Sequence, residues 1–141
     1  MSGFQLDTNC ISELVRPKLD RRVEAWMDAA DETMLYVSVL TLGEIRKGAA
    51  GLAQGKRRTD LETWLKVELP GRFSGRILPI DAAIADRWGF LAAEAKRKGK
   101  PLSIIDGLLA ATALHHNLTV VSRNADDVKN TPAQFLNPWE A

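Results

Sequence analysis

Short apolar segments alternate with longer segments of helical periodicity along the chain. The segment MLYVSVL at 34–40 is rich in β-branched and aromatic residues, which is typical of a strand buried on both faces. Strands are predicted over residues 3–6, 34–40, 76–80 and 118–122, with a weaker fifth at 133–136. Because helical segments separate them, the pattern predicts an α/β fold with a mainly parallel sheet of four to five strands, covered on both faces.

The helical segments have recognisable beginnings and ends. Helices are predicted to begin near Asn9, Asp20, Thr41, Arg57, Asp81 and Ser103. Pro17 ends the first helix, and Pro70 with Gly71 is expected to end the fourth at Leu69. The helices that begin at 41 and 57 form a predicted helical hairpin with a basic turn.

The composition sets the limits of this picture. With 141 residues, of which 45% are hydrophobic and 26% charged, the chain is expected to form a single domain over residues 1–141. No apolar stretch reaches the length of a bilayer span, and the first residues lack the pattern of a secretory signal, so a cytoplasmic protein is expected. Cys10 is the lone cysteine, which excludes an intrachain disulfide and a thiolate metal cluster and indicates a small buried residue.

The distribution of charge is more informative than its sum. A net charge of +1 argues neither for nor against a nucleic-acid partner. Basic residues gather at 46–58 and at 96–100, where they could contact phosphates. For any single residue among them, a solvated helix end is the simpler interpretation.

Several acids stand near the ends of predicted strands. Asp7 follows the first strand, Glu44 comes after the second, and Asp106 begins the helix before the fourth. Each acid has a structural alternative, because Asp7 could cap the first helix while Glu44 and Asp106 occupy the last position of capping boxes opened by Thr41 and Ser103. Taken singly, a capping role is the simpler interpretation of each.

The carboxyl edge of the sheet is where these acids can meet, joined by Asn124 and Asp127 after the fourth strand. Clustered carboxylates repel one another unless a cation lies among them, and Asp106 has apolar helical neighbours. Mg²⁺ or Mn²⁺ suits such oxygen ligands, whereas the histidine pair at 115–116 reads as a helix end and not as a zinc site. A cation held by Asp7 and Asp106 could position a phosphodiester and activate water, which favours hydrolysis of a nucleic acid.

The chain contains four ordered blocks, LDTNCISEL, SVLTLGEIRKG, DGLLAATALHHNLTVVSRNADD and LNPW. Together these blocks resemble the PIN-domain toxins of the VapC type. The segment RILPID is similar to the FitB-like branch of this family, and the resemblance covers essentially the whole chain. It implies a PIN-like three-layer α/β/α fold with a helical hairpin insertion. It also implies an endoribonuclease that depends on Mg²⁺, with Mn²⁺ as a substitute, and that acts on tRNA or ribosomal RNA as the toxin of a toxin–antitoxin pair.

The same resemblance assigns roles to individual residues. It places the metal acids at Asp7, Glu44 and Asp106, and a fourth acid near SRNADD. The FitB-like form has an acid at the position of Asn124, whereas many VapC-type members have Asn there and an acid three residues on, as Asp127 is here. The residues implied to position substrate or water are Thr8, Asn9, Ser122, Arg123 and Asn124.

Partners follow from the resemblance as well. It implies a cognate VapB- or FitA-like antitoxin, an RNA substrate, contact with DNA only through the antitoxin, and a homodimer. The predicted helices of residues 41–70 offer a candidate surface for the dimer, since Trp64 lies on a peripheral hairpin with little core of its own.

Two other functions remain open on the sequence. A PIN-like module could bind RNA and antitoxin without cutting, although a pure binder would face phosphates with bases and not with three acids. A receiver-like phosphoryl-transfer domain would also gather acids around Mg²⁺. It needs a phosphoacceptor Asp at the end of the third strand, where Asp81 has the simpler role of a helix N-cap.

Overall fold

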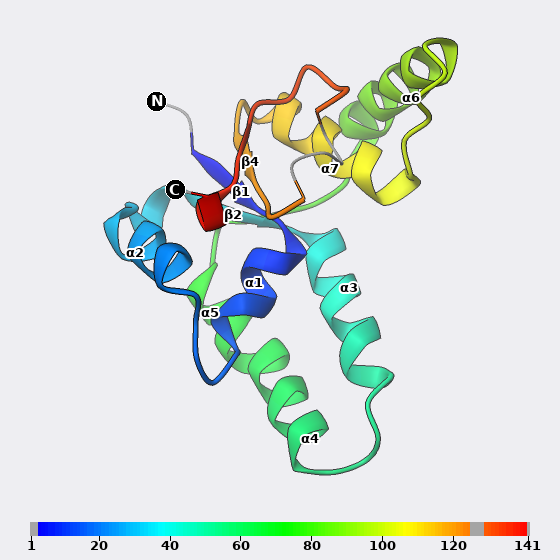
Figure 1. Ribbon diagram of the computed structural model, residues 1–141. Helices are drawn as coiled ribbons and strands as arrows, with labels where there is room; N and C mark the ends of the chain where they lie inside the picture. Colours follow the sequence, from blue (N-terminus) through cyan, green and yellow to red (C-terminus); the bar gives the residue numbers. More distant parts are fainter. Residues whose placement is uncertain (1–2, 125–128, 141) are drawn as a thin grey trace.

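A parallel sheet runs through the middle of the computed structural model, which describes residues 3–124 and 129–140 (Figure 1). Its strands are β1 (Phe4–Leu6), β2 (Leu35–Ser38), β3 (Ile77–Leu78), β4 (Thr119–Val121) and β5 (Phe135–Leu136). They are ordered β3-β2-β1-β4-β5, and each neighbouring pair is parallel. The predicted parallel sheet is therefore confirmed, including its weak fifth strand.

Helices cover both faces of this sheet (Figure 1). The helices are α1 (Thr8–Leu14), α2 (Arg21–Ala29), α3 (Val39–Ala50), α4 (Lys56–Thr63), α5 (Leu69–Arg72), α6 (Ala82–Arg97) and α7 (Ile104–His115). One hydrophobic cluster joins the sheet to α1, α2 and α3, and a second joins it to α7. Val121 belongs to the first cluster and its neighbour Val120 to the second, because successive side chains of a strand point to opposite faces. The three-layer α/β/α arrangement is confirmed.

The junction of β2 and α3 differs from the prediction. Strand β2 ends at Ser38, whose Oγ accepts a hydrogen bond from the N–H of Leu40 at 3.1 Å and caps α3. Thr41 is fully buried inside the helix, so the prediction that it opens the helix in a capping box with Glu44 was wrong. The apolar residues after Ser38 favoured a longer strand, but the serine side chain satisfies the first backbone N–H groups of a helix at that point.

The hairpin of α3 and α4 projects from the sheet, and its second arm is longer than predicted (Figure 1). The helix that begins at Lys56 continues through a π-helical turn (Trp64–Glu68) into α5 and passes Pro70. The prediction that Pro70 ends this helix was wrong. Pro70 lies in the first turn of α5, where a missing backbone N–H breaks no bond within that segment.

Close packing of α6 on α7 fixes the helix that carries Asp106. A Cβ atom added to Gly107 would lie 2.8 Å from Cδ1 and 2.9 Å from Nε1 of Trp88, so only glycine lets the indole approach α7 this closely. Ser103 caps α7, and Asp81 caps α6, as predicted. No helix of the described residues is long and apolar enough to span a membrane.

Candidate active site

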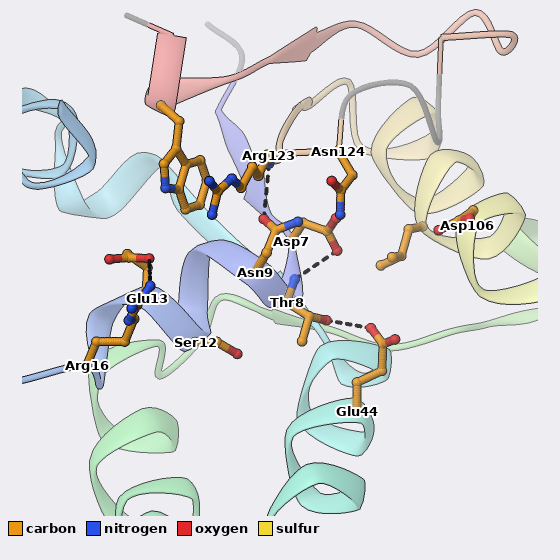
Figure 2. Close-up of a pocket in the computed structure, with 12 residues that line it drawn as sticks. Asp7, Thr8, Asn9, Ser12, Glu13, Arg16, Glu44, Asp106, Arg123 and Asn124 are labelled. Atoms are coloured by element: carbon orange, nitrogen blue, oxygen red, sulfur yellow. Dashed lines mark hydrogen bonds and ion pairs between the residues drawn. The ribbon is translucent and has the colours of Figure 1, made fainter. Parts of the chain in front are cut away.

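A cavity of about 460 Å³ opens where the carboxyl ends of β1, β2 and β4 meet. Its lining comes from α1, α3, α7 and the segments after β4 and β5, and Figure 2 shows these side chains. The lining residues are Asp7, Thr8, Asn9, Ser12, Glu13, Arg16, Glu44, Asp106, Leu109, Arg123, Asn124 and Trp139. The structure thus brings together three acids that are 37 or more residues apart in the sequence, as the topology predicts.

Asp7 lies at the centre of the cavity and caps α1. Its Oδ1 accepts a hydrogen bond from the N–H of Thr8, and its Oδ2 accepts one from Oγ of Ser122, both at 2.8 Å. Burial raises the pKa of the Asp7 carboxyl above its ordinary value, the two hydrogen bonds oppose this rise, and the negative charge of Asp106 adds to it. Asp7 therefore follows the end of β1, caps α1 and has a carboxyl whose ionised form is disfavoured by burial.

Ser122, directly after β4, connects three parts of the site. The residue is 1% exposed, and its hydroxyl donates to Asp7 and accepts from Nδ2 of Asn9 at 3.2 Å and from the N–H of Asn124 at 3.0 Å. Asn9 in turn accepts through Oδ1 from the N–H of Arg123 at 3.1 Å. This network ties the start of α1 to the end of β4 and holds Asp7 in one orientation.

Glu44 reaches the cavity from the second turn of α3. The hydroxyl of Thr8 donates a short hydrogen bond to Oε1 of Glu44, and Thr8 also contacts Oγ1 of the buried Thr41 at 3.4 Å. Thr8 therefore lies between two acids, since its N–H donates to Asp7 and its hydroxyl to Glu44 (Figure 2). The structure brings Glu44 to the cavity with Asp7, as the topology predicts, although the predicted start of its helix was wrong.

Asp106 reaches the cavity from the first turn of α7. Oγ of Ser103 donates to its Oδ2 at 2.8 Å and accepts from its N–H at 3.2 Å, so Ser103 caps α7 as predicted, but the Asp106 carboxylate bonds the Ser103 hydroxyl and not its backbone N–H, as a capping box would require. Two of the three acids, Asp7 and Asp106, thus serve helix ends and also line the cavity. The structural and the chemical interpretation of these acids are compatible.

The sequence reasoning missed five residues of the cavity: Ser12, Glu13, Arg16, Leu109 and Trp139. Glu13 follows Cys10 and Ile11 on the covered side of α1 and is buried, and its distance of three residues from Arg16 is the spacing of a helical ion pair. This spacing, directly before Pro17, could have indicated an ion pair between Glu13 and Arg16 at the end of the first helix. Cys10 is buried as expected, and burial raises the pKa of its thiol, which makes it a poor nucleophile.

The donors of the cavity suit a hard divalent cation, because they are carboxylate, amide and hydroxyl oxygens. Within residues 3–124 and 129–140, no three His, Cys, Asp or Glu side chains lie close enough together to form a metal-binding group. Two carboxylates completed by water and substrate oxygens are the usual arrangement for Mg²⁺, so the residues present fit such an ion. Asp127, the other residue predicted for the site, lies outside the described residues.

Comparisons with known proteins agree with this geometry. The model of the PIN domain family matches residues 5–133. VapC ribonuclease Y4jK of Sinorhizobium fredii is 40% identical over 135 residues, which cover 96% of each chain, and Toxin FitB of Neisseria gonorrhoeae is 39% identical over 134 residues, which cover 95% of this chain and 96% of FitB. A chain in the solved structure of FitAB bound to the IR36 DNA fragment superposes with a TM-score of 0.90 at 37% identity, over 96% of this chain and 95% of that one.

Proposed function

The chain belongs to the PIN domain family, and on this basis we propose that it is a metal-dependent endoribonuclease, the toxin of a VapBC-type toxin–antitoxin pair. Its substrate would be the phosphodiester backbone of RNA, with tRNA or ribosomal RNA as the class. The relatives named VapC ribonuclease and Toxin FitB, each aligned over nearly the whole chain, support both parts of this proposal.

The observation that carries the proposal is the convergence of Asp7, Glu44 and Asp106 on one open cavity. Burial raises the pKa of Asp7, and the negative charge of Asp106 adds to this rise, so a cation between these two carboxylates would relieve the cost of ionising Asp7. In this proposal Asp7 and Asp106 bind Mg²⁺ or Mn²⁺ directly, and Glu44 binds it directly or through water. A cation bound there would polarise the scissile phosphodiester and make a water molecule a stronger nucleophile.

The remaining residues would position these groups. Ser122 holds the Asp7 carboxylate by donating to Oδ2, and Thr8 holds Glu44 by donating to Oε1, so neither acid can rotate out of the cavity without losing a hydrogen bond. Asn9 fixes the backbone of Arg123, whose guanidinium we assign to a substrate phosphate. Each of these residues acts by orientation and takes no proton from the substrate.

The fourth acidic position is assigned to Asp127. The side chain of Asn124 offers a neutral amide oxygen, which cannot balance the charge of a cation. The backbone N–H of Asn124 donates to Oγ of Ser122. We propose that Asp127 belongs to the outer part of the metal site through water. Asn124 would then hydrogen-bond a ligand or a metal-bound water.

The partner proposed for this chain is a VapB- or FitA-like antitoxin. The solved structure of FitAB bound to DNA contains a chain that matches this one over most of its length, which supports a cognate partner that carries the DNA contact. An arginine or lysine of the antitoxin would compete with metal and substrate at the acids. A homodimer through the hairpin of residues 41–70 with Trp64 completes the proposed assembly.

The experiment that tests the activity uses the purified chain, free of antitoxin, and end-labelled RNA. Cleavage should appear with Mg²⁺ or Mn²⁺, disappear in EDTA, and be lost in Asp7→Asn, Glu44→Gln and Asp106→Asn variants whose circular dichroism is unchanged. Asp86→Asn is the matched control, because Asp86 is an exposed acid of α6 outside the cavity. Full activity in EDTA, or in any of the three acid variants, would contradict the assigned roles.

The same assay separates the acids after β4. Asp127→Ala should raise the Mg²⁺ concentration needed for cleavage, whereas Asp126→Ala should not. The reverse pattern would move the fourth acid to Asp126. RNA binding without cleavage under every metal condition would favour the alternative of a binding module.

A further inference from the structure

The cavity has an acidic side and a side that carries two arginines together with Glu13. Figure 2 shows Arg16 and Arg123 on one side of Asp7, with Glu44 and Asp106 on the other. All of these residues line the same cavity. A polyanion that approached the acids alone would be repelled, so the arginine side is where a nucleic acid can gain affinity.

Arg16 is held in place by a buried acid. Its Nη1 lies 3.4 Å from Oε1 of Glu13, whose side chain is 5% exposed, while the Arg16 side chain is 63% exposed. Oε2 of Glu13 accepts a hydrogen bond from the N–H of Asp20 at 3.0 Å, which anchors the segment after Pro17. Because a buried carboxylate is costly without partners, Glu13 is best explained as the anchor that fixes the end of α1 and its arginine.

Arg123 is held in place by an aromatic ring. Its guanidinium carbon lies 5.4 Å from the ring centroid of Trp139, which is 5% exposed. The carbonyl of Arg123 accepts from Nδ2 of Asn137 at 3.2 Å, and Oδ1 of Asn137 accepts from the N–H of Trp139 at 2.9 Å. Among residues 3–124 and 129–140, the Arg123 guanidinium has no hydrogen-bond acceptor. None of its donors is therefore taken up by the described part of the chain.

We propose that Arg16 and Arg123 bind backbone phosphates of the substrate RNA next to the scissile phosphodiester, and that Glu13 is the positioning residue of Arg16. This inference rests on the proposed function and adds the path of the strand, which crosses the cavity from the acids toward Trp139. A planar guanidinium group can donate two parallel hydrogen bonds to two oxygens of one phosphate. Contacts with Glu13 and Trp139 orient the two guanidinium groups before the ligand binds. The Glu13 contact uses one nitrogen of Arg16 at 3.4 Å, which leaves the exposed part of the group for phosphate.

The test is binding of a fluorescent single-stranded oligoribonucleotide to the full chain without antitoxin, in EDTA, followed by anisotropy at several salt concentrations. Arg16→Ala and Arg123→Ala should each weaken binding roughly tenfold, and each should reduce the slope of log K against log salt by ~0.7, the value for one lost contact with a single strand. Arg16→Lys and Arg123→Lys should keep the slope and lose only part of the affinity, since lysine keeps the charge but not the fork.

Arg22→Ala is the matched control. Arg22 is also an exposed arginine, 55% exposed, and also contacts an acid nearby, Asp20 at 3.6 Å, but it lies outside the cavity. Its removal should change neither affinity nor slope. Because Arg16→Ala leaves Glu13 buried without its partner, the double variant Glu13→Gln/Arg16→Ala removes both charges and should lose affinity to the same extent.

Unchanged RNA affinity and slope in both arginine variants would overturn the inference, as would the absence of RNA binding by the wild-type chain. Loss of antitoxin binding with RNA affinity intact would assign the arginines to the protein partner and overturn it too. None of these measurements requires cleavage. If the wild-type chain binds RNA but does not cleave it in the presence of metal, the proposed nuclease function is wrong. The proposed phosphate contacts are then still decided by the salt dependence of RNA binding in the arginine variants.

Discussion

Replacing Ser122 by alanine tests the central network of the site. The change removes one donor to Asp7 and the shared acceptor of Asn9 and Asn124, which are three hydrogen bonds of 2.8 to 3.2 Å at a residue that is 1% exposed. At about 0.5–1.5 kcal/mol for each bond, and with water able to reach the outer ends of Asn9 and Asn124, we expect the free energy of unfolding to fall by about 2–3 kcal/mol. For a chain of this length the melting temperature should fall by roughly 6–12 °C.

The loss should depend on pH because Ser122 donates to the ionised form of Asp7. The folded chain raises the pKa of Asp7 above its ordinary value of 3.8, so folded Asp7 holds its proton more tightly than unfolded Asp7. The free energy of unfolding therefore falls as the pH rises through the unfolded and then the folded pKa. Without the Ser122 donor the pKa of Asp7 rises further, and the difference between variant and wild type should be larger at neutral pH than below the ordinary pKa.

Two measurements check this reasoning. Urea unfolding at neutral and acidic pH gives the difference in stability, and a ¹³C NMR titration of the Asp7 carboxyl gives its pKa in each protein. Ser12→Ala is the control, because Ser12 is exposed on α1 at the rim of the same cavity and its loss should change the stability by less than about 0.5 kcal/mol. A Ser122→Ala variant that matched the Ser12→Ala variant, with an unmoved Asp7 pKa, would refute the network.

Two further predictions concern packing and assembly. Gly107→Ala should lower the free energy of unfolding by about 1–2 kcal/mol, because the added methyl group would meet the Trp88 indole at 2.8 Å. Gly89→Ala on α6 is the control and should be neutral or stabilising, because nothing lies within 4 Å of the added methyl group. Equal effects of the two changes in denaturant unfolding would argue against the tight contact of Gly107 with Trp88. Light scattering of the isolated chain should give about twice the 15.6 kDa of one copy if the proposed homodimer forms, and a mass of one copy at all concentrations would reject it.

The sequence predicted the meeting of the acids because topology alone determines it. Strands that alternate with helices commonly form a parallel sheet, and parallel strands bring Asp7, Glu44 and the residues after β4 to one edge whatever the exact element boundaries are. This explains how the position of Glu44 was predicted correctly although Thr41 was wrongly taken as the helix start. Local caps such as Asp81 and Ser103 were also readable, because each depends on neighbours within three residues.

Features that depend on contacts between distant segments could not be predicted in this way. Pro70 is tolerated within a helical run because a π-helical turn precedes it, and nothing in the local sequence announces that turn. Arg123 and Trp139 meet only because β5 returns the chain to the site. Periodicity describes which face of an element is covered, but not which residue of another element covers it.

Residues 7–16, a short segment that contains α1, supply half of the residues that line the cavity. Six of the twelve lining residues, Asp7, Thr8, Asn9, Ser12, Glu13 and Arg16, fall within ten consecutive codons. Acidic and basic side chains of the cavity are therefore carried by one short segment, which contains the roughly two turns of α1. If the chain is harmful to its host when unopposed, spontaneous mutations that let cells survive its expression would concentrate in this opening segment. The α3–α4 hairpin, which contributes Glu44 alone to the cavity, would be left comparatively free to diverge along with whatever protein it contacts.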